Sequence, residues 1–157
     1  MSLLEYYCND LGVKLEIDDS IIFRMVSESK KHYPKEFGGI LLGRYTEDFN
    51  KAIITDIIIP TEFENSKTQF KRGNKGIEKR LRKEYNKKPS IIYLGEWHTH
   101  PESLPEPSNT DISTFTQLSE ISSVLIRNPI MLIIGLSKDG HEHKFYVINN
   151  KSLYRYE

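Results

Sequence analysis

The sequence lacks several features that define whole classes of protein. It holds a single cysteine, Cys8, which excludes an internal disulfide framework and any zinc cluster built on two or four thiolates. Its apolar runs, such as 130–134, are far shorter than the roughly 20 residues of a membrane-spanning helix. The formal net charge is zero, from 22 basic and 22 acidic side chains, which argues against a dedicated nucleic-acid-binding protein. No basic and then apolar signal segment opens the chain, so we expect a cytoplasmic protein.

What the chain does contain is typical of one globular domain. Its 157 residues, 38% hydrophobic and 28% charged, suffice for a core and argue against disorder or a coiled-coil rod. Apolar periodicity and turn signals predict strands at 13–17, 37–45, 52–59, 90–99, 130–136 and 144–148, helices at 18–33, 73–88 and 111–126, and loops at 61–71 and 102–109. This order predicts a single α/β (α+β) domain over 1–157, with its core at about 13–148 and a mixed sheet flanked by helices.

The most informative segment contains His98 and His100 at the end of a predicted strand. Side chains in a strand alternate between its faces, so both imidazoles point to the same side. A proline-rich loop follows and returns the chain at Asp111, which begins a predicted helix. Two histidines and one carboxylate form a ligand set for catalytic zinc, in which the fourth position is left for water.

Each part of this pattern also has a plainer interpretation. Two histidines at this spacing are often surface or half-buried imidazoles without a metal. Ser108 and Asp111 have the spacing of a capping box, in which the serine caps the helix and the acid bonds back to it. The joint spacing of the four residues favours a site over these separate explanations.

That joint pattern, His98-x-His100-Pro101 followed by six residues, Ser108, two residues and Asp111, resembles the signature of the JAMM (MPN+, or JAB-domain) zinc metalloproteases. The family also carries a glutamate just before a glycine-rich apolar strand, and Glu36 stands in a similar position here. The resemblance spans most of the chain, from residue 21 to residue 148.

The resemblance implies a role for each residue of the pattern. His98, His100 and Asp111 would bind one zinc ion per chain. Glu36 would act as general base and then as general acid, and Ser108 would stabilise the oxyanion. The implied fold is a mixed sheet related to cytidine deaminases, although a deaminase itself is excluded because Cys8 cannot supply its paired thiolates. The implied activity is amide hydrolysis, on an isopeptide bond to a ubiquitin-like modifier.

Other residues compete for roles in this site. Glu96 shares the strand face of the two histidines, so chemistry alone also nominates it as a base or ligand; the family pattern favours Glu36. His141 and His143 form a second pair at the same spacing, which we interpret as exposed hairpin residues because no partner motif follows. Glycines at 38, 39 and 43 lack the spacing of a phosphate loop and instead predict close backbone approach.

A basic segment precedes the histidine strand. Residues 71–88 contain nine Lys or Arg and two Glu, a net charge of +7 hidden within the neutral total. It predicts either a solvated helix face, with Glu78 and Arg82 paired, or a docking surface for an acidic partner or nucleic acid. The candidate substrate-binding residues are Lys71, Arg72, Lys79, Arg82 and Trp97. Two alternative functions remain open: a nucleic-acid-associated protein like the RadC branch, and a partner-binding MPN scaffold with an occluded zinc site.

Overall fold

The computed structural model describes residues 2–122 and 128–157. The strands are β1 (Leu3–Cys8), β2 (Val13–Asp18), β3 (Gly38–Tyr45), β4 (Lys51–Ile58), β5 (Phe63–Asn65), β6 (Phe70–Arg72), β7 (Ile92–Pro101), β8 (Ile130–Leu136), β9 (His141–Asn149) and β10 (Ser152–Arg155). The helices are α1 (Asp19–Lys30), α2 (Ile77–Tyr85) and α3 (Asn109–Ser122). Of the helix predicted at 111–126, the last four residues lie outside the described part of the chain.

Eight strands form one mixed sheet in the order β1-β2-β4-β3-β7-β8-β9-β10. The β2–β4 and β7–β8 pairs are parallel and the other neighbours antiparallel. The α+β architecture with a mixed sheet is therefore as predicted. Beyond β10, Glu157 pairs with Tyr7 of β1 through two main-chain hydrogen bonds of 2.9 and 2.7 Å, so the two edges of the curved sheet are linked.

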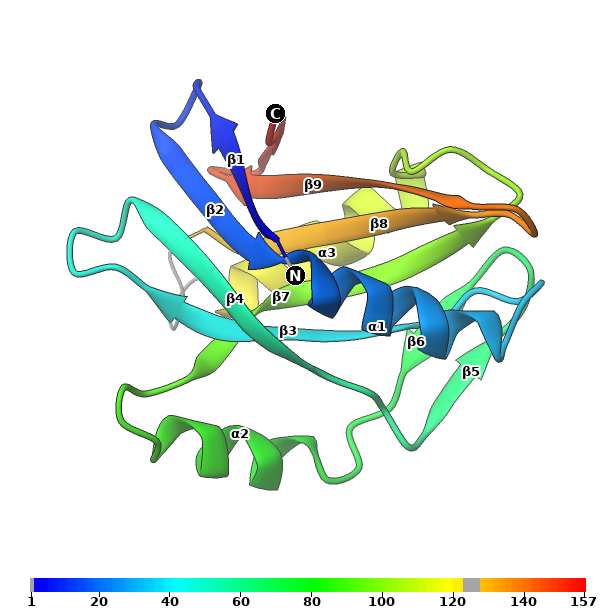
Figure 1. Cartoon of the computed structure of the whole chain (residues 1–157), viewed down its shortest axis with the longest axis horizontal. Helices are drawn as coiled ribbons and strands as arrows, with labels where there is room; N and C mark the ends of the chain where they lie inside the picture. Colours follow the sequence, from blue (N-terminus) through cyan, green and yellow to red (C-terminus); the bar gives the residue numbers. More distant parts are fainter. Residues whose placement is uncertain (1, 123–127) are drawn as a thin grey trace.

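Helices cover both faces of this sheet, with α1 in front of it and α3 behind it (Figure 1). The α1 side holds the main core, in which Leu41, Trp97 and Leu132 point from β3, β7 and β8 toward Met25. The neighbouring residues of the same strands point to the opposite face, where α3 and α2 cover two smaller apolar clusters. Strand β8 is buried on both faces, which explains its uninterrupted apolar sequence.

Local sequence signals place α1 where it was predicted. The Asp18 carboxylate accepts a hydrogen bond of 2.9 Å from the Ser20 N–H, which satisfies a free donor at the helix start. The predicted apolar face is buried as expected at Ile22, Met25, Val26 and Ser29. The helix ends at Lys30, however, so the last predicted member of that face, at residue 33, lies beyond it.

Two predictions for the middle of the chain are corrected. The segment predicted as a loop at 61–71 forms most of a β-hairpin, β5–β6, in a two-stranded sheet of its own. Helix α2 is shorter than the predicted 73–88, because its N-cap residue Gly76 has a φ of 75° and lies outside the helix. None of the helices in the described residues is long and apolar enough to cross a membrane.

The glycines that begin β3 allow the close strand contact predicted for them. A Cβ atom added to Gly38 would lie 2.2 Å from the main-chain oxygen of Trp97 on β7. We therefore expect Gly38→Ala to lower the free energy of unfolding by about 2 kcal/mol or more and the Tm by roughly 5 °C. Gly140→Ala is the matched control, since its added Cβ meets nothing within 4 Å. Equal melting temperatures for the two variants would contradict this expectation.

Candidate metal centre

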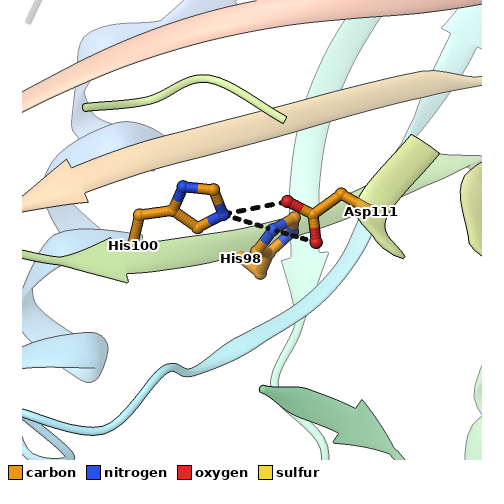
Figure 2. A group of neighbouring side chains, drawn as sticks. All are labelled: His98, His100 and Asp111. Carbon is orange, nitrogen blue, oxygen red and sulfur yellow. Dashed lines mark hydrogen bonds and ion pairs between the residues drawn. The ribbon is translucent and has the colours of Figure 1, made fainter. Parts of the chain in front are cut away.

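Three side chains from two elements converge at the end of β7 (Figure 2). The Nε2 atoms of His98 and His100 are 3.2 Å apart, because the alternation of the strand puts both rings on the α3 side. Asp111, in the first turn of α3, places Oδ1 3.3 Å from His98 Nε2 and Oδ2 3.0 Å from His100 Nε2. These residues form the single group of three or more potential metal ligands among the described residues.

The spacing of these atoms fits a tetrahedral zinc ion. With bonds of about 2.05 Å to nitrogen and oxygen, two ligand atoms of a tetrahedron lie about 3.3 Å apart. The three contacts of 3.0–3.3 Å are close to this value and involve both oxygens of Asp111, and one ligand atom from each residue lies within 4.8 Å of the other two. Three such ligands would leave the fourth position of a tetrahedral ion for water. In addition, Nδ1 of His100 lies 3.2 Å from the carbonyl oxygen of Leu104, which favours a proton on Nδ1, so the neutral ring would offer Nε2 to a metal in place of the hydrogen bond to Asp111.

Asp111 also completes the capping box. The Ser108 hydroxyl accepts a 3.0 Å hydrogen bond from the Asp111 N–H, and Asp111 Oδ2 accepts one of 3.0 Å from the Ser108 N–H. The structural and the metal-binding interpretations of this pair are therefore compatible. Since the hydroxyl acts here as an acceptor, its own hydrogen remains available to another group.

Asp111 and His100 shift each other's pKa. Burial disfavours the charged form of Asp111, but hydrogen bonds from the two histidines outweigh it and hold the pKa of Asp111 well below its usual range. Burial would likewise lower the pKa of His100, but its hydrogen bond to Asp111 and the charge of that carboxylate raise it above the ordinary value. The carboxylate thus stays ionised and ready to bind a cation.

Glu36 lies in the segment between α1 and β3, and its side chain is 7% exposed. Burial raises the pKa of its carboxyl group, while His98 and His100 partly oppose this increase. A buried carboxylate with a raised pKa beside a ligand set is suited to proton transfer.

A residue between the two histidines fixes this arrangement, and sequence reasoning missed it. The Thr99 hydroxyl accepts a 3.0 Å hydrogen bond from the Phe37 N–H, and the Thr99 N–H donates one of 2.8 Å to the Phe37 carbonyl. The residue that follows Glu36 is thus bonded to the residue between the ligands. The signal in the sequence was the alternation of side chains along β7, which places Thr99 on the face opposite to His98 and His100.

A cleft of about 670 Å³ opens beside these groups. One end of it is bordered by Glu36, His98, Ser108 and Asp111. Its other walls come from α3, β7, β8 and the β5–β6 hairpin and are lined by Thr68, Gln69, Phe70, Lys71, Arg72, Glu96, Trp97, Thr110, Thr114, Phe115, Leu118 and Met131. The structure thus gathers Glu36, Ser108 and two of the three potential ligands, His98 and Asp111, at one cavity.

The predicted substrate-binding residues divide between the cleft and its surroundings. Lys71 and Arg72 line the cleft, whereas Lys79 and Arg82 lie exposed on α2, and Arg82 forms the predicted pair with Glu78 at 3.5 Å. Trp97 borders the cleft but is only 1% exposed, and its indole packs on Phe37 in the core. Contrary to expectation, its ring is therefore not available to a substrate.

The competing residues have other partners. Glu96 forms an ion pair with Arg72 at 2.8 Å, so the negative charge of its carboxylate already has a positive partner. His143 is half-buried rather than exposed, and its Nε2 lies 2.7 Å from the hydroxyl of Tyr6; His141 is exposed as predicted. In the described part of the chain these two histidines join no group of three potential ligands.

Known proteins resemble this chain in sequence. The family described as Prokaryotic homologs of the JAB domain matches residues 18–148. A protein of Enterobacter hormaechei subsp. hoffmannii (strain UCI 50), named CD-NTase/cGAS isopeptidase, is 38% identical over 120 residues, which are 76% of this chain and 66% of that protein. This chain thus spans just under two thirds of that relative. The Probable metalloprotease y4qB of Sinorhizobium fredii (strain NBRC 101917 / NGR234) is 26% identical over 121 residues, which are 75% of this chain and 73% of that protein.

A solved structure also resembles the chain. The solution structure of a protein from Desulfitobacterium hafniense has a TM-score of 0.61 and 18% identity, and the match covers 88% of this chain and 87% of that one. At this identity the likeness concerns the fold alone, and it agrees with the mixed sheet. The family match contains Glu36 and all three residues of the triad. The chain therefore belongs to the prokaryotic homologues of the JAB domain, the family that its histidine and aspartate signature resembles.

Proposed function

We propose that this protein is a zinc-dependent peptidase that hydrolyses an isopeptide bond or a similar amide. The observation that carries the proposal is the convergence of His98, His100 and Asp111, whose potential ligand atoms lie within 4.8 Å of one another, beside a cleft that Glu36 also lines. When bound there, zinc supplies Lewis acidity toward a carbonyl group and makes a water molecule more acidic. A resident metal suits the name of one relative, a probable metalloprotease, and hydrolysis of an isopeptide bond suits the name of another, an isopeptidase.

Two further residues of this chain have roles in the proposal. Glu36 takes a proton from the attacking water and later delivers it to the leaving amine, for which its raised pKa is suitable. Ser108 donates its hydroxyl hydrogen to the oxygen of the attacked carbonyl, which is possible because its oxygen accepts from the Asp111 N–H. The chain thereby provides a base, an acid and an oxyanion donor.

We propose a protein conjugate as the substrate. Resemblance to the JAMM proteases suggests a ubiquitin-like modifier, and the name CD-NTase/cGAS isopeptidase suggests a CD-NTase for the relatives. Conjugates of a ubiquitin-like modifier and conjugates of a CD-NTase belong to one chemical class, in which the carboxyl end of one protein is joined by an amide bond to another protein. The cleft of about 670 Å³ is large enough for several residues of an extended chain.

The test combines metal content and hydrolysis. The protein is purified, its zinc is measured, and it is incubated with fusions that join a ubiquitin-like protein or a CD-NTase to the N-terminus of green fluorescent protein. We expect one zinc per chain and cleavage at the junction of at least one fusion. Zinc well below one per chain, without gain on reconstitution, would refute the proposal. Bound zinc without cleavage of either class would favour the scaffold alternative.

Exposed basic residues of the 71–88 segment, one of which lines the cleft, support an acidic partner. Lys71, Lys79 and Lys83 have no ion-pair partner within the described residues, and all three are exposed. They would attract a negatively charged region of the conjugate. DNA binding that weakens steeply with salt would instead favour the nucleic-acid-associated alternative. If the protein does not bind DNA even at low salt, the nucleic-acid-associated alternative is excluded.

The pKa of His100 predicts how zinc binding depends on pH. Only the neutral imidazole of His100 can bind zinc. In the metal-free protein, the hydrogen bond to Asp111 and the charge of that carboxylate raise the pKa of His100 despite its burial. Protons therefore compete with zinc from a pH above the ordinary value of about 6.5, and affinity falls as the pH falls through the raised pKa. A competition titration against a chelator at several pH values measures this. An affinity that stays constant until the pH is below about 6.5 would contradict it.

A further inference from the structure

The main chain of Glu36 is held by the β5–β6 hairpin, although no strand contains this residue. Its N–H donates a 2.8 Å hydrogen bond to the carbonyl of Ser66, in the turn of the hairpin. Its carbonyl accepts a 2.9 Å hydrogen bond from Nδ2 of Asn65, the last residue of β5. Both polar groups of this peptide segment therefore depend on the hairpin, and the side chain of Asn65 supplies one of the two bonds.

The hairpin is too small to hold its own position. Each of its strands has three residues, and an isolated pair of strands is at best marginally stable in water. Part of its support is apolar, since Phe63 and Phe70 pack on Phe37 with ring centroids 5.2 and 5.7 Å apart. The other support is polar and comes from the strand that carries the metal ligands.

This polar support joins Arg72 of β6 to Glu96 of β7. Nε and Nη2 of Arg72 donate to the two oxygens of Glu96 at 2.8 and 3.0 Å, a two-pronged contact between side chains that are 16% and 17% exposed. Tyr93 donates a third hydrogen bond of 2.6 Å to the same carboxylate. Glu96 stands two residues before His98 on the same strand face, so the hairpin is tied directly to the ligand strand.

These contacts form a continuous path from the proposed base to the proposed metal site. We infer that Asn65 and the Arg72–Glu96 pair are positioning residues, which set the place of the Glu36 carboxylate relative to the triad; this inference rests on the proposed function. Glu96 then acts through Arg72 and the hairpin and not as a base, because its carboxylate accepts three hydrogen bonds already.

The expected effect follows from the geometry of proton transfer. A displacement of about 1 Å at a catalytic group can cost roughly 100-fold in rate. We expect Asn65→Ala and Glu96→Gln each to lower kcat by about tenfold. We also expect their combined effect to be smaller than the product of the two, since both loosen the same hairpin. For Asn65→Ala we expect KM to change less than about twofold, because Asn65 is not among the residues that line the cleft.

The experiment measures two quantities in each variant. The first is cleavage of the green fluorescent protein fusion that the wild type cleaves. The second is amide hydrogen exchange at Glu36, which needs neither substrate nor metal and is expected to accelerate about tenfold when its contact with the hairpin loosens. Glu64→Gln is the matched control, since it makes the same change on an exposed residue of β5. Asn65→Asp, which keeps the size but removes the donor, replaces Asn65→Ala if that variant misfolds.

The outcomes separate this inference from the proposed function. Faster exchange at Glu36 with unchanged exchange at Leu132 of the core, a lower kcat and one zinc per chain would support the inference. Unchanged exchange at Glu36 would overturn it, even if the wild type cleaves the fusion. A wild type that cleaves nothing would refute the proposed function, while the exchange result still decides the positioning role. Loss of all activity in Glu96→Gln with normal exchange at Glu36 would make Glu96 the base.

Discussion

Replacement of Glu36 with glutamine is expected to leave zinc bound and to lower kcat by about 10²–10⁴-fold, the usual contribution of a general acid-base group. The amide keeps the size and the main-chain bonds of Glu36 but cannot take up a proton at neutral pH. Because Glu36 is not one of the triad, its loss removes no potential ligand. Single-turnover cleavage of the fusion, with zinc measured on the same sample, tests both halves of the expectation.

Glu62→Gln is a suitable control for this variant. Glu62 lies just before β5, and the one ion pair recorded for its exposed side chain, with Lys75 at 3.9 Å, is long. It is therefore expected to retain full activity. If Glu36→Gln were as active as the wild type, another group would have to move the proton, and the mechanism proposed here would be wrong.

The second large effect is expected from His98→Ala, which should lose the metal itself. His98 supplies one of three potential ligand atoms, and the remaining two residues hold zinc much more weakly. After dialysis we expect zinc well below one per chain and no detectable cleavage, with the fold retained because an alanine fits the strand. Elemental analysis, circular dichroism and the fusion assay measure these three quantities.

His141→Ala is the matched control, because it removes an exposed imidazole from β9 without touching the triad. We expect it to keep both zinc and activity. Full zinc content in His98→Ala would show that this residue is not a ligand. Loss of zinc in both variants would point to a binding site other than the triad.

The sequence predicted those parts of the molecule that depend on local spacing. The alternation of β7 placed His98 and His100 on one side, and the capping box spacing placed Asp111 in the first turn of α3, which starts two residues earlier than predicted. The same alternation puts Trp97 on the opposite face, so its burial could have been predicted from its odd position between Glu96 and His98. The strands β3, β4, β8 and β9 were likewise predicted from apolar runs and turn signals.

The parts that were missed depend on contacts between distant residues. Strands of three residues, such as β5 and β6, are too short to show a period, and their polar segment is typical of a loop. The Arg72–Glu96 pair joins residues 24 positions apart, and one sequence offers no signal that selects this arginine from a basic segment. For the same reason, Arg72 was expected to contact a substrate, whereas Glu96 already engages two of its nitrogens.

The dual use of Asp111 has a consequence for how this site can change during evolution. One Asp111 oxygen, Oδ2, accepts the helix-capping hydrogen bond from the Ser108 N–H and also faces His100. The cap needs neither histidine, so replacing both would abolish the ligand set while the start of α3 stayed intact. A descendant could therefore lose the proposed hydrolysis through substitution of the histidines and keep its architecture for another task. Substitution of Asp111, by contrast, would act on chemistry and folding together, so we expect this position to change last.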